Sequence, residues 1–264
     1  MLRKSFVLRC AALMAVMAAA AGGYAIAYQQ GYVHGFGIRT PQEMALFCGV
    51  MLAVMLCLQA WIQWNGRLAF MGASVDVRVL SVIILGTLLP MFHTARDGFR
   101  FTGDNTWDQF VYFFVFPMIF IMLVFGERPK DYGFCLGNWR EGLLWTVIGC
   151  GLMAPILWYL GHHNEAMQHY YSMGPERPVG VVLGKWGVEM LAWEYIWRGF
   201  YLAALLRIMP PGPALFLHAV PFCFMHMGKP LLETLSTPFG GACFGFVAWR
   251  SRSFVPAFLI HWFM

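Results

Sequence analysis

The sequence predicts an all-α membrane protein, a polytopic bundle of about eight or nine transmembrane helices with a cytoplasmic N-terminus. Hydrophobic residues make up 59% of the 264 residues and charged residues only 12%, whereas a soluble domain has about 25% charged residues. Most of the long apolar runs approach or reach the roughly 20 residues that a helix needs to cross a hydrocarbon core. The basic residues are divided unevenly between the loops, and this asymmetry sets the orientation.

The first apolar run extends from Phe6 to Ala27, behind Arg3 and Lys4. It ends in Ala25-Ile26-Ala27, which resembles a signal-peptidase site, so a cleaved signal peptide is one interpretation. The run is longer than the usual ~7 to 15 apolar residues of a signal peptide, and we therefore favour an uncleaved first helix. The other predicted helices are 43–64, 79–94, 109–125, 142–160, 180–208, 213–227, 238–249 and 254–264. Between them we expect polar loops at 95–108 and 161–178 and a turn-rich connection at 126–134.

The charge pattern predicts a multi-pass protein of the cell membrane, and we expect the bacterial cytoplasmic membrane. With the N-terminus inside, eleven of the 18 Lys and Arg residues lie on the cytoplasmic side and five on the other. The net charge of +5 does not indicate a nucleic-acid partner, because the basic residues are spread among short loops. The seven cysteines form no CxxC pair and are expected to pack rather than bind metal. We expect one transmembrane domain, 1–264, with the candidate catalytic helices in 180–264.

One helix in this last third carries a pair of opposite charges within the sequence WEYIWRGF at 193–200. Glu194 and Arg198 are four residues apart, so they share a helix face and can form an ion pair. Ionisable groups at membrane depth are costly and usually face the bundle interior or a wet cavity, which makes them candidates for function. The alternative interpretation is an ion pair that only fixes helix packing.

A histidine is predicted at the same depth as this acid. The proline-rich segment 209–213 must turn, and His226 follows Pro210 by as many residues as Glu194 precedes it. In an antiparallel hairpin, equal distance from the turn means equal depth, here about 24 Å. A lone histidine in an apolar helix is more often a packing residue, but an acid at the same level weakens that interpretation. Phe222 and His218 precede His226 on the same predicted helix, and we keep both as supporting residues.

A second histidine lies in the last apolar run. His261 follows the turn Arg250-Ser251-Arg252-Ser253 and the run FVPAFLI. Glu194, His226 and His261 thus lie on three neighbouring predicted helices. One carboxylate and two imidazoles are sufficient to activate a water molecule, either directly or as ligands of a zinc ion.

These residues resemble the CPBP family of intramembrane proteases, which includes CAAX-processing proteases and Abi bacteriocin-immunity proteins and is related to the type II CAAX prenyl endopeptidases. The matches are ExxxRG at 194–199, FxxxH at 222–226, HMGKPLLETL from His226, and His261 after an RxxS turn. The resemblance covers about residues 186–264, while the rest of the chain matches only as a multi-helix membrane scaffold. It implies a peptidase that acts on a membrane-associated peptide or protein in the lipid bilayer.

The sequence departs from the family pattern at two places. The family motif is usually EExxxR, and Trp193 stands where the first glutamate is expected. The family's last motif is HxxxN or a related sequence, and its polar position would be residue 265, beyond Met264. Variants with a single glutamate before xxxRG also resemble this chain, so Glu194 can take the role of the base, whereas Glu189 would lie on another helix face.

The predicted mechanism is hydrolysis of a peptide bond by activated water. Glu194 would be the general base, His226 would help to hold the water, and His261 would stabilise the oxyanion. In a metal-dependent version the same three residues would bind zinc, and we rank the metal-free version slightly ahead. The main alternative is a non-catalytic CPBP-like protein that binds a peptide or confers bacteriocin immunity, with Trp193 as its best support. A transporter ranks third, because no matched pair of broken helices is present.

Overall fold

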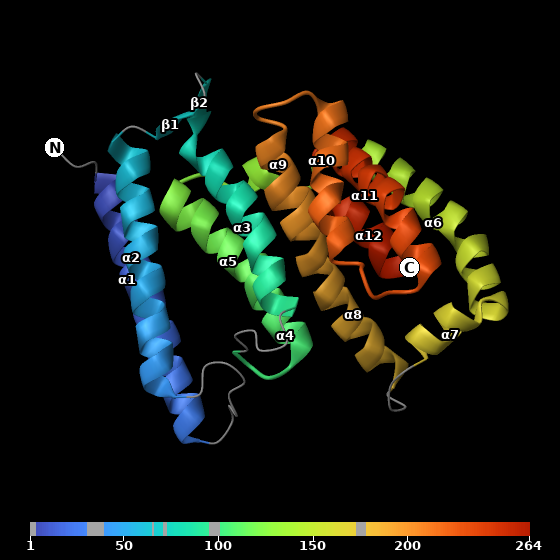
Figure 1. Ribbon diagram of the computed structural model, residues 1–264, viewed down its shortest axis with the longest axis horizontal. Coiled ribbons are helices and arrows are strands. Elements are labelled where there is room, and N and C mark those ends of the chain that lie inside the picture. Colours follow the sequence, from blue (N-terminus) through green and yellow to red (C-terminus); the bar gives the residue numbers. More distant parts are fainter. Residues whose placement is uncertain (1–3, 31–39, 65, 71–72, 95–100, 173–177) are drawn as a thin grey trace. The chain divides into compact units, whose positions relative to one another are not determined.

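The computed structural model describes residues 4–30, 40–64, 66–70, 73–94, 101–172 and 178–264. It confirms the all-α membrane bundle expected from the sequence (Figure 1). In the described part of the chain, six helices are long and apolar enough to cross a membrane: Lys4–Gln29, Pro41–Trp64, Val77–Thr94, Asn105–Phe125, Trp139–His163 and Leu231–Ser251. Each corresponds to a predicted apolar run, since runs of this length can bury every backbone polar group only as helices.

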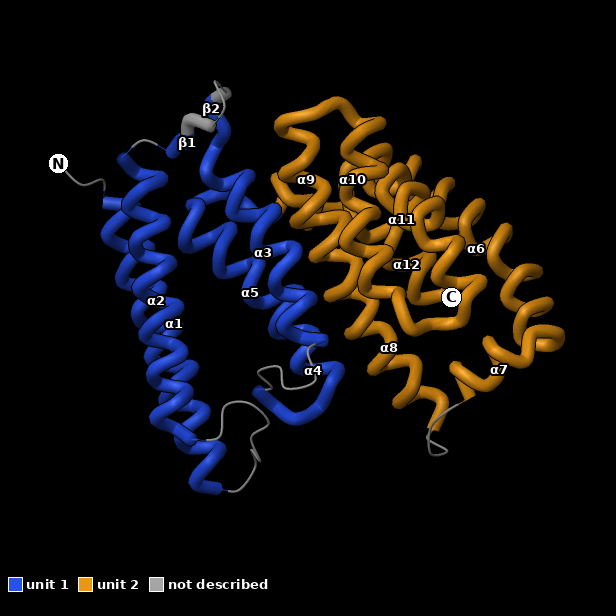
Figure 2. The backbone as a smooth tube through the Cα atoms, in the orientation of Figure 1, with its two compact units in different colours: residues 1–129 blue, residues 130–264 orange. Residues whose placement is uncertain are grey.

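The chain divides into two compact units, Met1–Pro129 and Lys130–Met264 (Figure 2). The first unit contains α1 (Lys4–Gln29), α2 (Pro41–Trp64), β1 (Arg67–Phe70), β2 (Ala73–Asp76), α3 (Val77–Thr94), α4 (Asn105–Phe110), η1 (Val111–Val115), α5 (Phe116–Ile119) and η2 (Phe120–Phe125). The last four follow one another as a single helix over 105–125. The antiparallel hairpin β1–β2 was not predicted from the sequence, and its strands pair Arg67 with Asp76 and Phe70 with Ala73.

A polar side chain in α2 supports the irregular end of the 105–125 helix. Both η1 and η2 are π-helical, and Gln59 of α2 donates from Nε2 to the carbonyl of Leu123, within η2, at 3.0 Å. The amide oxygen of Gln59 accepts from the Cys10 thiol of α1 at 3.2 Å. Gln59 is only 1% exposed, so these bonds satisfy a polar group in an otherwise apolar interface.

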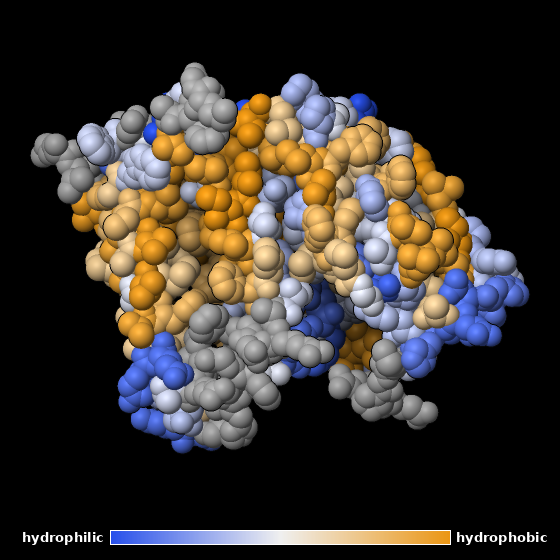
Figure 3. Space-filling view, viewed as in Figure 1, coloured by the Kyte–Doolittle hydropathy of each residue, from blue (hydrophilic) through white to orange (hydrophobic). Residues whose placement is uncertain are grey.

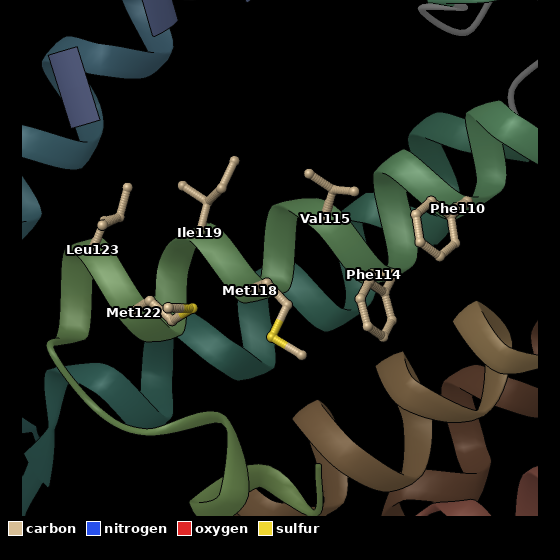
Figure 4. Close-up of a pocket in the computed structure, with 7 residues that line it drawn as sticks. All are labelled: Phe110, Phe114, Val115, Met118, Ile119, Met122 and Leu123. Atoms are coloured by element: carbon tan, nitrogen blue, oxygen red, sulfur yellow. The ribbon is translucent and has the colours of Figure 1, made fainter. Parts of the chain in front are cut away.

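The surface of the first unit agrees with a position in lipid. In Figure 3 its visible helices are hydrophobic along their length and hydrophilic near one end of α1 and α2. A hollow of about 290 Å³ along the 105–125 helix is lined by apolar side chains only, including Phe110, Phe114 and Met118 (Figure 4). A hollow with this lining is suited to contact with acyl chains.

The second unit holds the helices that carry the predicted site. Its elements, with η3 at the boundary, are η3 (Pro129–Tyr132), α6 (Trp139–His163), α7 (Glu165–Tyr171), α8 (Val179–Glu194), η4 (Tyr195–Tyr201), α9 (Leu202–Leu205), α10 (Pro211–Phe224), α11 (Leu231–Ser251) and α12 (Val255–Phe263). Helix α10 packs against α11, and α12 packs against α6, α8 and α11. These contacts bring the three segments with Glu194, His226 and His261 together (Figure 1).

Helix α7 corrects the prediction of a polar loop over 161–178. The side chain of Asn164 accepts a hydrogen bond from the backbone of Met167 at 3.0 Å and begins the helix. Tyr171 at its end donates to the Glu233 carboxylate of α11 at 2.7 Å. Burial and this hydrogen bond raise the pKa of Tyr171, so the phenol stays protonated and able to donate.

Candidate active site

Glu194 lies where the helix changes its winding. It is the last residue of α8 and is followed by the π-helical segment η4, Tyr195–Tyr201, within what the sequence predicts as one continuous helix over 180–208. Short π-helical segments inside α-helices are rare and occur frequently at functional sites. Apolar periodicity contains no signal for such a segment, so the sequence could not predict it.

The Glu194 carboxylate accepts two hydrogen bonds on one oxygen. Arg198 Nη1 donates to Oε1 at 3.0 Å, and His261 Nδ1 lies 2.5 Å from the same Oε1. The side chains of Glu194 and Arg198 are both 0% exposed. The other carboxylate oxygen, Oε2, is buried and has no hydrogen-bond partner among the described residues. Since buried carboxylate oxygens are normally hydrogen-bonded, Oε2 is a position for a water molecule or a substrate N–H.

Arg198 is held by aromatic rings as well as by the acid. Its guanidinium carbon lies 4.1 Å from the centre of the Phe222 ring and 5.1 Å from that of Phe244. Contact with a ring face stabilises a buried cation. The arginine is therefore positioned by α10 and α11 at the same time as it positions Glu194.

His226 lies two residues after the end of α10, whereas the sequence predicted it inside a helix over 213–227. Helix α10 ends at Phe224, and Gly228 in the turn that follows has a φ of +101°, a conformation that favours glycine. His226 Nδ1 lies 2.8 Å from the carbonyl oxygen of Phe222. Because a carbonyl oxygen can only accept, Nδ1 must carry a proton, and in the neutral ring Nε2 is then an acceptor.

Trp193, the residue at the position of the missing glutamate, lies beside His226. The two ring centres are 5.9 Å apart, and the indole also contacts Phe222 at 5.9 Å. Trp193 thus fills the space next to His226 with an apolar ring, while the neighbouring Glu194 is bonded to His261. Glu194 is thus the acidic member of the hydrogen-bonded group that it forms with Arg198 and His261.

His261 is joined to the site by α12. Its side chain is 12% exposed, and its ring stacks on Phe244 with centres 5.1 Å apart. Phe244, which contacts both His261 and Arg198, was not predicted as a site residue. Its role depends on the rotation of α11, which a run such as FGGACFGFVAW does not specify.

His218, predicted as a supporting residue, is fully buried in α10. It packs against Gly245 of α11, where a side chain would collide with the imidazole ring. His218 lies one turn before Phe222 and therefore on the same side of α10. Its described surroundings make it part of the α10–α11 contact.

The predicted zinc ligands are not arranged as a ligand set. Among the residues that the structure describes, no group of three or more His, Cys, Asp or Glu side chains is positioned to hold a metal ion. Glu194 Oε1 and His261 Nδ1 are bonded to each other, and His226 Nδ1 to a backbone carbonyl. The donors as placed do not fit a metal ion.

Comparison with known proteins identifies the same part of the chain. Residues 175–264 match the family model described as "Type II CAAX prenyl endopeptidase Rce1-like". No curated protein and no solved structure was found to match the chain. The matched region begins just before α8 and contains Glu194, His226 and His261. The match to residues 175–264 of this multi-pass membrane protein thus supports its similarity to the CPBP family of CAAX-type proteases.

Proposed function

We propose that the protein is an intramembrane endopeptidase in which Glu194 activates the attacking water. The proposal rests on the different hydrogen-bonding environments of the two carboxylate oxygens of Glu194. Arg198 and His261 hold Oε1, while Oε2 is buried without a partner among the described residues. A general base needs this combination of a fixed orientation and a free acceptor.

His226 and His261 have separate roles in the proposed reaction. His226 presents Nε2 as an acceptor, because Nδ1 donates to the Phe222 carbonyl, and can orient a water molecule. Glu194 accepts a proton from that water as its oxygen attacks the peptide carbonyl. His261 donates a hydrogen bond from Nδ1 to Glu194 Oε1, and when doubly protonated it donates a second one from Nε2 to the oxyanion. As the tetrahedral intermediate collapses, the C–N bond breaks and the proton taken up by Glu194 passes to the leaving nitrogen, which completes hydrolysis and restores the carboxylate.

The family description suggests the first substrates to test. Because the matched model is described as a CAAX prenyl endopeptidase, the panel includes prenylated peptides ending in a CAAX sequence together with unmodified membrane peptides. Glu194 is fully buried, and His261 is the partly exposed member of the site. A substrate therefore enters from the α12 side in this proposal.

The test compares cleavage by the full-length protein with cleavage by Glu194→Gln. The amide keeps the shape of the side chain but is a poor base, so the rate should fall by at least the ~10² typical of general-base loss. Glu189→Gln is the matched control, five residues earlier on another face of α8, and should cleave at nearly the original rate. Bound metal is quantified in the same preparations. Normal cleavage by Glu194→Gln would show that the assignment is wrong.

Trp193 favours one alternative function, a CPBP-like protein that binds a peptide without cleaving it. The indole lies edge-on to the His226 ring, and it stands at the position where the family motif has a second carboxylate. If the original protein binds members of the panel but cleaves none, and Trp193→Glu produces cleavage, the binding function is correct for this chain.

A further inference from the structure

A hollow distinct from the candidate active site lies at the start of helix α6 and the end of helix α11. It has a volume of about 890 Å³ and lies within the second unit, lined by Lys130, Asp131, Cys135, Gly137, Asn138, Glu141, Trp249, Arg250 and Arg252. Helix α6 begins at Trp139 and α11 ends at Ser251, and both are long and apolar enough to cross a membrane. The hollow therefore lies at the level where lipid tails meet headgroups.

Its walls are two chain segments locked together by hydrogen bonds. Asn138 N donates to the Ser251 carbonyl at 2.7 Å, Ser253 Oγ donates to the Cys135 carbonyl at 2.5 Å, and the Cys135 thiol donates to the Arg252 carbonyl at 3.2 Å. Gly137 packs so closely on the Ser251 and Arg252 carbonyls that a side chain there would collide with them. The shape of the hollow is therefore built into the backbone and does not depend on flexible side chains alone.

Three cationic side chains, Lys130, Arg250 and Arg252, and two acidic ones, Asp131 and Glu141, line the hollow. Arg250 is paired with Glu141 through two bonds of 3.0 and 2.6 Å. Lys130 and Arg252 form no ion pair with any described residue. A ligand with a negative charge would complete their coordination, and a phosphate group offers the acceptor oxygens that lysine and arginine prefer.

The aromatic residues indicate that the phosphate belongs to a lipid. Trp249 lines the hollow and is 36% exposed, and Trp139, at the start of α6, is 59% exposed. Tryptophan is enriched where a membrane protein crosses the headgroup level. The predicted topology also places this end of α6 and α11 on the cytoplasmic side, where anionic lipids and basic juxtamembrane residues attract each other.

We infer that this hollow binds the headgroup of an anionic phospholipid, with its phosphate between Lys130 and Arg252 and its glycerol end toward Trp249. The site is independent of the proposed peptidase reaction. Its ligand would hold the 133–138 segment and the α11–α12 turn at the membrane surface.

The experiment measures lipid binding to the detergent-solubilised full-length protein by native mass spectrometry. The probes are short-chain phosphatidylglycerol, short-chain phosphatidylcholine and inorganic phosphate. We expect phosphatidylglycerol to bind more tightly than phosphatidylcholine, and Lys130→Gln combined with Arg252→Gly to weaken it about 25-fold, since each basic residue near an anionic surface contributes about fivefold. Glycine suits position 252, because Arg252 has a φ of +55°.

Two further variants separate the site from general positive charge. Arg140→Gln removes a neighbouring cation that does not line the hollow, and Arg252→Lys keeps the charge, so both should bind phosphatidylglycerol nearly as the original protein does. Equal binding of the two lipids, or unchanged binding by the double variant, would overturn the inference. Inorganic phosphate that binds as tightly as the lipid and displaces it would also overturn it, in favour of a site for a free anion.

Discussion

At the residue scale, Arg198 compensates the negative charge of the buried Glu194 carboxylate. It donates to Glu194 at 3.0 Å, and its guanidinium contacts the rings of Phe222 and Phe244. Removing one member of a buried ion pair costs about 3–5 kcal/mol, because the other charge is left uncompensated. We therefore expect Arg198→Met to lose about that much stability, measured by denaturant unfolding in detergent.

A double variant provides the control for this prediction. Glu194→Gln with Arg198→Met should be more stable than Arg198→Met alone, since no unpaired charge is then buried. Strictly additive losses would contradict the view that the two side chains stabilise each other.

The residues of the candidate site could largely be found in the sequence, but their contacts could not. Glu194, Arg198, His226 and His261 are polar groups in apolar surroundings, so their cost at membrane depth singles them out. Phe244 is one apolar residue among many, and only the packing of α11 places it against His261 and Arg198. Residues of this kind become recognisable only when the rotation of each helix is known.

At the element scale, Gly199 allows the π-helical segment η4 to approach the backbone of η3 closely. A Cβ at this position would lie 2.8 Å from the carbonyl oxygen of Tyr132 and 2.8 Å from the Tyr195 ring. Overpacking of this kind costs about 1–3 kcal/mol, so Gly199→Ala should lower the free energy of unfolding by that amount. Gly184→Ala is the matched control on α8, where the added Cβ has no atom within 4 Å other than its chain neighbours and the helix's own nearby backbone. It should be neutral or stabilising, as expected for alanine in a helix.

Gln59 permits a second element-scale prediction, in the first unit. Its amide satisfies the carbonyl of Leu123 in the π-helical segment η2. Interhelical hydrogen bonds in membrane proteins contribute about 0.6 kcal/mol on average and at most about 1.7. Gln59→Leu should therefore destabilise the protein by about 1 kcal/mol in the same unfolding assay. Gln63→Leu, at an exposed position of α2, should change stability little, and an equal loss in both variants would argue against the hydrogen bond.

At the scale of the whole molecule, the apolar runs predicted the helices closely because hydrophobic length alone decides which segments can cross a bilayer. The predicted run 43–64 corresponds to α2 and 79–94 to α3. The features that escaped prediction depend on local backbone chemistry: the β1–β2 hairpin, helix α7 and the π-helical segments. The end of α10 at Phe224, before His226, is of the same kind.

Orientation in the membrane is the last prediction, and it belongs to the chain as a whole. Eleven basic residues lie inside and five outside if the N-terminus is cytoplasmic, and the segment before α6 is then cytoplasmic while α7 is on the opposite side. In a cysteine-free background, a cysteine at Leu136, which is 74% exposed, should react with a membrane-impermeant maleimide only after the cells are opened. A cysteine at Tyr171, which is 52% exposed, should react in intact cells. The reverse pattern would invert the topology and move the proposed lipid site away from the cytoplasmic leaflet.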